Sequence, residues 1–122
     1  MIEQLADKVN ANAALVRRGQ YLDTTFLLQV GPDSWLVTVE KGRITSVARQ
    51  SRSIGDCAFA LRASREAWSE FWQRIPKPGF HDLIALSKFR HLSVEGDIKV
   101  FMSHLRYFKD VLASLRNTGV AA

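Results

Sequence analysis

The sequence is poor in cysteine and in long apolar runs. Its one cysteine, Cys57, has no partner for an internal disulfide, which favours a reducing compartment. No apolar run approaches the roughly 20 residues that span a bilayer. Residues 1–18 lack the basic start and the apolar core of a secretory signal. These absences predict a cytoplasmic protein.

The sequence also lacks the short motifs that carry common chemistry. It has no glycine-rich phosphate loop, no Cys-x-x-Cys pair and no His-Glu-x-x-His helix, so we predict no cofactor and no metal site. Of the histidines His81, His91 and His104, only His81 is followed by a carboxylate, and neighbouring helical side chains point about 100° apart. We therefore predict no catalytic residue. A small enzyme that uses His81 or Asp82 as acid or base is the alternative.

Concentrated charge is missing as well. The net charge is +5 and the isoelectric point about 9.8, but the basic residues are scattered and form no run interleaved with aromatic residues. We interpret them as solvated surface and predict no nucleic-acid partner. Transient contact with an acidic membrane surface, a partner enzyme and a homodimer are left open.

The chain does have enough apolar sequence for a single domain over residues 1–122. Apolar residues make up 47% of it, which is enough for a hydrophobic core without disulfide bonds. Apolar residues at helical spacing predict an N-terminal helix within residues 1–18 that stops at Gly19. Alternating apolar residues and a Lys41–Gly42 hairpin predict an antiparallel meander of four strands, over residues 21–30, 35–39, 44–48 and 56–62.

The second half returns to helical spacing. Ser64 is a suitable N-cap for a helix with an aromatic face, which ends at the break over residues 76–79. A short helix over residues 80–87, a strand over 92–95 and a Gly96–Asp97 hinge precede the last helix, which Asp97 is expected to cap. The apolar seam of that helix comprises Ile98, Phe101, Met102, Leu105, Phe108, Leu112 and Leu115. This order predicts an α+β fold, a five-stranded, mainly antiparallel sheet covered on one face by helices.

The aromatic residues gather in the second half and can serve two purposes. Large aromatic side chains bury well and dominate packing, which favours a plain core. Small-molecule sites are also lined mainly by apolar and aromatic side chains, which favours a pocket for a hydrophobic ligand. Spacing alone does not separate the two. An interaction protein whose cavity is filled by its own side chains is a third interpretation.

Four segments carry a resemblance to a known family. They are Phe26–Val30 (FLLQV), Ser34–Val39 (SWLVTV) with the Lys41–Gly42 hairpin, Asp56–Leu61 (DCAFAL) running into the helix at Ser64, and Leu92–Asp97 (LSVEGD) entering the last helix. In order and spacing they resemble the sterol carrier protein 2 (SCP2) family of sterol-binding domains, over residues 21–115. Residues 76–89 depart from the family pattern and add apolar side chains that would fill part of a tunnel.

The resemblance implies one SCP2-like lipid-binding domain, which carries its ligand or works beside an enzyme. The ligand would be a sterol, a fatty acyl chain or another lipid-like molecule, in an apolar tunnel between the sheet and the helices. The residues expected to line this cavity are Phe26, Leu28, Phe59, Trp68, Phe71, Trp72, Phe80, Ile84, Phe101, Met102, Leu105 and Phe108. The residues expected to meet a polar head group at its mouth are His81, Arg90, His91 and His104.

Overall fold

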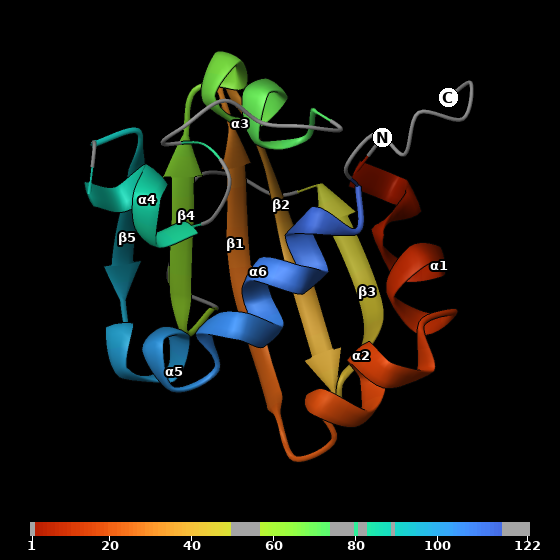
Figure 1. Ribbon diagram of the computed structural model, residues 1–122. Coiled ribbons are helices and arrows are strands. Elements are labelled where there is room, and N and C mark those ends of the chain that lie inside the picture. Colours follow the sequence, from red (N-terminus) through yellow and green to blue (C-terminus); the bar gives the residue numbers. More distant parts are fainter. Residues whose placement is uncertain (1, 50–56, 74–79, 81–82, 89, 116–122) are drawn as a thin grey trace.

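A computed structural model describes residues 2–49, 57–73, 80, 83–88 and 90–115 as a sheet with helices on one face (Figure 1). The strands are β1 (Asp23–Val30), β2 (Asp33–Glu40), β3 (Arg43–Arg49), β4 (Phe59–Ala63) and β5 (Leu92–Gly96). The helices are η1 (Ile2–Gln4), α1 (Leu5–Asn10), α2 (Ala13–Arg18), α3 (Arg65–Phe71), α4 (Leu83–Lys88), α5 (Ile98–Ser103) and α6 (Leu105–Ala113). In Figure 1, α6 crosses in front of β1 and β2, α1 lies beside β3, and α4 lies beside β5. The predicted α+β class with five mainly antiparallel strands is confirmed.

The described sheet runs in the order β3-β2-β1-β4-β5. β1, β2 and β3 form the antiparallel meander that the sequence predicts. The prediction is wrong for β4, which lies on the other side of β1 and pairs with it in parallel, with Phe26 opposite Phe59. Phe59, Ala60 and Leu61 are all fully buried, and β4 lies inside the sheet between β1 and β5. Alternating apolar positions alone do not predict the burial of Ala60, which lies between them.

The N-terminal segment is not the single helix that the sequence predicts. Between α1 and α2, Asn12 leaves helical geometry and caps α2, because its side chain accepts a hydrogen bond from the N–H of Leu15 at 3.2 Å. The side-chain amide of Asn10 exchanges hydrogen bonds of 3.0 and 2.9 Å with the backbone of Ile44 on β3. Asparagine side chains that bond to backbone compete with helix continuation, which explains the break. Gly19 ends α2 as predicted.

The C-terminal segment is also two helices instead of the predicted one. His104, with φ −126° and ψ 31°, interrupts the helix between α5 and α6. Asp97 caps α5 as predicted and accepts a hydrogen bond from the N–H of Val100 at 3.3 Å. The apolar seam is not continuous across the break, since Ile98 and Met102 are each 49% exposed. The buried seam residues are Phe101, Phe108, Leu112 and Leu115.

The β2–β3 hairpin is the point where three parts of the chain meet. Lys41 and Gly42 have positive φ, 51° and 81°, as a tight hairpin turn of this type requires. A Cβ at Gly42 would lie 2.3 Å from the carbonyl oxygen of Val16 at α2, so space also demands glycine. The hydroxyl of Tyr107 on α6 donates a hydrogen bond of 2.7 Å to the carbonyl oxygen of Gly42. The hairpin therefore joins α2 to α6.

The core between the sheet and the last two helices contains a phenylalanine cluster of Phe26, Phe59, Phe101 and Phe108. Phe26 and Phe59 stack with ring centroids 5.3 Å apart. Phe108 packs edge-on against them, at 5.5 and 5.0 Å, and Phe101 lies 5.5 Å from Phe59. All four residues are at most 2% exposed. These rings occupy the space between β1, β4 and the last two helices.

Candidate functional site

Most residues predicted to line a cavity are buried. Beyond the phenylalanine cluster, the buried members are Leu28, Trp68, Phe71 and Trp72. Phe80 and Leu105 are half-buried, whereas Ile84 and Met102 are exposed, by 41% and 49%. Ile84 and Leu105 line a separate groove of about 220 Å³ between α4 and α6. The structure thus brings the core phenylalanines together as packed rings, and the cavity lined by the whole set stays a prediction.

The predicted head-group residues are dispersed. His81 lies outside the described residues, as does Asp82, the second acid–base candidate of the enzyme alternative. Arg90 is exposed and has a positive φ of 64°. The ring of His91 stacks on Phe80 with centroids 4.6 Å apart, and both residues line a hollow of about 260 Å³. His104 lies between α5 and α6, with its Nδ1 atom 3.4 Å from the carbonyl oxygen of Val100. A head-group role for these residues stays a prediction.

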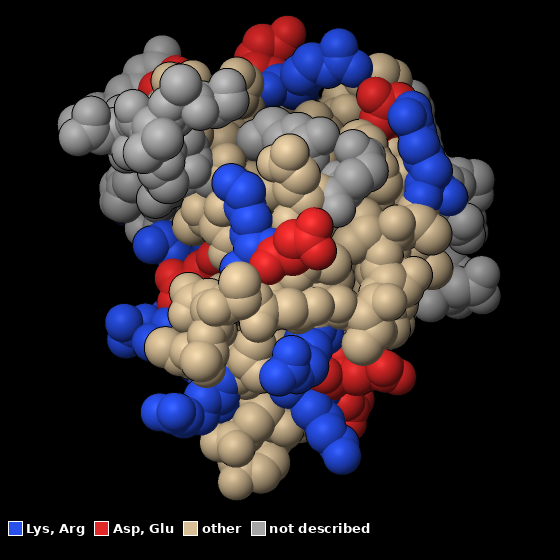
Figure 2. Space-filling view, turned by 90° about the vertical axis from the view of Figure 1, so that its right-hand side faces the viewer, with Lys and Arg blue, Asp and Glu red and all other residues tan. Residues whose placement is uncertain are grey.

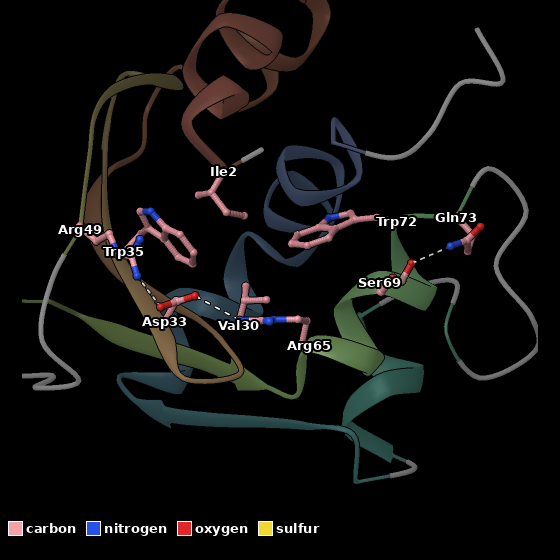
Figure 3. Close-up of a pocket in the computed structure, with 9 residues that line it drawn as sticks. All are labelled: Ile2, Val30, Asp33, Trp35, Arg49, Arg65, Ser69, Trp72 and Gln73. Carbon is pink, nitrogen blue, oxygen red and sulfur yellow. Dashed lines mark hydrogen bonds and ion pairs between the residues drawn. The ribbon is translucent and has the colours of Figure 1, made fainter. Parts of the chain in front are cut away.

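A larger cleft opens at the end of the sheet where β1 finishes and β2 begins (Figure 3). Its volume is about 530 Å³. We call it the sheet-end cleft, and its lining comprises Ile2, Val30, Asp33, Trp35, Arg49, Arg65, Ser69, Trp72 and Gln73. The lining comes from η1, three strands and α3 with the two residues that follow it, so the cleft exists only in the folded chain. Of the predicted cavity residues, Trp72 alone belongs to it.

The walls of the sheet-end cleft are apolar. In Figure 3 the indoles of Trp35 and Trp72 lie on opposite sides, with Ile2 and Val30 between them. These four residues are 4–8% exposed, so they form a preformed surface and not a loose patch. The indole N–H of Trp72 donates to the carbonyl oxygen of Leu112 at 2.9 Å, which satisfies its polar group away from the cleft.

Trp72 is supported from behind by a second indole. Trp68 stacks on it with centroids 5.5 Å apart and donates its own N–H to the carbonyl oxygen of Gln29 at 2.8 Å. Trp68 lies within α3 and Trp72 directly follows it, so this helix positions both indoles. Ser64 caps the first turn of α3, as predicted. The Ser64 hydroxyl oxygen accepts a hydrogen bond from the N–H of Ala67 at 3.0 Å. The position of this wall is therefore determined by α3.

Among the described residues, three charged side chains lie at the rim of the sheet-end cleft, and we call them the Arg–Asp–Arg triad. Asp33 forms ion pairs with Arg49 and with Arg65, the latter at 3.3 Å (Figure 3). The guanidinium carbon of Arg49 also lies 5.3 Å from the ring centroid of Trp35, a cation–π contact. One carboxylate between two guanidinium groups leaves a surplus of one positive charge within this triad.

Sequence reasoning did not find this rim. The two arginines were counted among the scattered basic residues that we interpreted as solvated surface. A signal existed for Arg49, because hairpin register places it opposite Trp35, although a bulge between Thr38 and Val39 shifts the count by one residue. Arg65 comes to the rim only through the parallel pairing of β4 with β1, which the predicted meander excludes.

Among the described residues, no group of three His, Cys, Asp or Glu residues is placed to hold a metal ion. None of the described helices is long and apolar enough to cross a membrane. On the face that Figure 2 shows, Lys and Arg side chains are separated by other residues and form no continuous basic patch. A cytoplasmic location and the absence of a nucleic-acid partner stay predictions.

The five-stranded sheet with its helices is the fold of the sterol carrier protein 2 class of domains. A crystal structure of sterol carrier protein 2 matches with a TM-score of 0.76 and 13% identity, over 94% of this chain and 92% of that chain. Palmitated SCP2L2 from Aedes aegypti matches with a TM-score of 0.58 and 14% identity, over 91% of this chain and 89% of that chain.

A longer protein contains a similar domain. The stereoselective inverting sec-alkylsulfatase Pisa1 from Pseudomonas sp. matches with a TM-score of 0.56 and 13% identity, over 84% of this chain and 15% of that chain. No protein-family model and no curated protein matches this sequence. Likeness at these identities shows the fold, so a function must be argued from the site.

Proposed function

We propose that this protein binds and carries a hydrophobic, lipid-like molecule without transforming it. The observation that carries the proposal is the sheet-end cleft, an open hollow of about 530 Å³ with walls formed by two indoles and two aliphatic side chains. Hydrophobic ligands favour a concave, mostly apolar and preformed surface of this size. The fold adds support, since one similar structure is described as palmitated.

We place the apolar body of the ligand between Trp35 and Trp72. Covering about 200 Å² of apolar ligand surface there would contribute about 5 kcal/mol, before the cost of losing free motion is subtracted. The tunnel predicted between the sheet and the helices would lie deeper than this site. Trp72 belongs to both, but a ligand reaching farther would have to displace the phenylalanine cluster, which is closely packed.

The test uses phenylnaphthylamine, a neutral apolar probe whose fluorescence rises when it leaves water. We expect the native protein to bind it and a Ser69→Trp variant to bind at least about tenfold more weakly, because an indole at this exposed lining position would occupy part of the cleft and obstruct the ligand. The matched control is Ser87→Trp, the same change at an exposed position of α4 outside the cleft lining. It should bind like the parent protein.

Two other outcomes are informative. No binding of the probe to the native protein, together with no lipid detected on the purified protein by native mass spectrometry, would overturn the proposed function. Binding that is unchanged by Ser69→Trp would place the ligand elsewhere and would refute the sheet-end cleft as the site. Circular dichroism of each variant checks that the fold is intact.

A further inference from the structure

The Arg–Asp–Arg triad is placed where a ligand in the sheet-end cleft would end. The side chains of Arg49 and Arg65 are 67% and 63% exposed, so both guanidinium groups are open to solvent at the rim. A guanidinium has five N–H donors. Within the described residues, Asp33 is the one carboxylate that contacts either arginine, and each contact uses one terminal nitrogen. Donors therefore remain on both sides of Asp33.

Asp33 also arranges the two arginines in advance. Without a carboxylate between them, two guanidinium groups at one rim would repel each other. With it, Arg49 is oriented by Asp33 and by the ring of Trp35, and Arg65 is oriented toward the same carboxylate. Groups that are already ordered lose less side-chain freedom when a ligand binds. The rim thus combines a net positive charge with a preset geometry.

From this arrangement we infer that the sheet-end cleft selects apolar molecules that carry one oxyanion group, such as a carboxylate or a sulfonate. The oxyanion binds Arg49 and Arg65 beside Asp33, while the apolar body lies between the two indoles. This inference rests on the proposed function and adds the chemical class of the ligand to it. Arginine suits the role because its planar fork pairs with oxyanions through two hydrogen bonds.

The alternative is that the triad only ties β2, β3 and α3 together. The two possibilities differ in what Asp33 does. As a purely structural tie, Asp33 would matter for stability alone. As part of an anion site, Asp33 also repels the ligand. Neutral asparagine removes this repulsion and retains one oxygen that can still accept a hydrogen bond from an arginine, so it should tighten anion binding.

The experiment compares two probes that share their rings and differ in one group. Anilinonaphthalene sulfonate carries a sulfonate, and phenylnaphthylamine does not. We expect Arg49→Gln and Arg65→Gln each to weaken binding of the sulfonate about fivefold, the size of one partly exposed charge contact. Binding of the neutral probe should be unchanged, and Asp33→Asn should strengthen binding of the sulfonate only.

Two further variants serve as controls. Arg43→Gln removes the same charge at the opposite, exposed end of β3 and should leave binding of both probes unchanged. Arg65→Lys retains the charge but not the planar fork, so it should weaken binding of the sulfonate less than Arg65→Gln does, and it can still be measured if Arg65→Gln proves too unstable. High salt should weaken binding of the sulfonate and leave the neutral probe unaffected.

The outcomes separate the two proposals. If the protein binds neither probe, the proposed function fails. If it binds both but the arginine variants weaken both equally or neither, the selection of an oxyanion is overturned while the proposed function stands. Stronger binding of the sulfonate by Asp33→Asn supports an anion site, whereas unchanged selectivity with lower thermal stability indicates a structural tie.

Discussion

At the scale of single residues, Tyr107 is a buried polar group that is held by close packing and by a hydrogen bond. Its ring is buried against Gly19, where an added Cβ would lie 2.4 Å from the Tyr107 Cε1 atom. Its hydroxyl donates to the carbonyl oxygen of Gly42. Burial raises the pKa of Tyr107 above its usual value, because ionisation would place a charge in the protein interior. The neutral hydroxyl is therefore part of the folded state.

Replacing Tyr107 by phenylalanine tests this role. We expect the free energy of unfolding at neutral pH to fall by about 1–3 kcal/mol, since the carbonyl of Gly42 loses its side-chain donor. Above pH about 10 the unfolded parent chain releases the Tyr107 proton while the folded chain retains it, so the parent loses stability as pH rises. The variant lacks this loss, so the difference between the two proteins should shrink.

Urea unfolding of both proteins at neutral pH and above pH 10 measures the effect. A difference in unfolding free energy that stays constant across this range would contradict the account. It would mean that the hydroxyl of Tyr107 titrates alike in the folded and unfolded chains.

At the scale of elements, α3 connects the stability of the fold to the sheet-end cleft. The helix begins at its Ser64 cap, places Arg65 at the rim and supports the Trp72 wall through Trp68. Helix α5 is the natural comparison, since it has a similar length and begins at a similar cap, Asp97, but contributes nothing to the lining of the cleft.

Removing each cap tests the connection. Ser64→Ala and Asp97→Ala should each lower the free energy of unfolding by about 1 kcal/mol, the usual value of an N-cap. Only Ser64→Ala should also weaken binding of phenylnaphthylamine, because fraying of α3 shifts the Trp72 wall. Urea unfolding and probe titration of both variants give the comparison, and equal effects on binding would refute the special role of α3.

At the scale of the whole molecule, the sheet-end cleft depends on segments that are far apart in the sequence. Ile2 lies near one end of the sequence, and the indole N–H of Trp72 donates a hydrogen bond to the carbonyl oxygen of Leu112, near the other end. The three strands that contribute to the lining belong to one continuous sheet. A ligand in the cleft should therefore bind only the folded chain and stabilise it as a unit.

This expectation is quantitative. With free phenylnaphthylamine at a hundredfold excess over its dissociation constant, the free energy of unfolding should rise by about 2.7 kcal/mol. Thermal or urea unfolding with and without the probe measures the gain. The Ser69→Trp variant should show no gain, and an equal gain in that variant would indicate binding outside the cleft.

The predictions that the structure confirms depend on neighbouring residues. Ser64 and Asp97 cap helices, and Gly19 ends one, because each acts on backbone groups within a turn of itself. The wrong predictions involve distant partners. The helix break near Asn10 follows from hydrogen bonds to Ile44 on β3, and β4 pairs with β1 across the chain instead of with β3. The pattern of apolar residues along the sequence does not show that Asn10 bonds to Ile44 or that β4 pairs with β1.

The sequence alone was enough to predict the α+β class, the hairpin at Lys41–Gly42 and most of the buried residues, although Ile84, Ile98 and Met102 are exposed. Those features follow from local backbone preferences and from the period of apolar side chains. The packing of four phenylalanine rings between the sheet and the helices follows only from the tertiary structure. The same holds for the apolar cleft with a charged rim that opens at the end of the sheet. Both arise from the parallel placement of β4 beside β1, which brings α3 and Arg65 to Asp33.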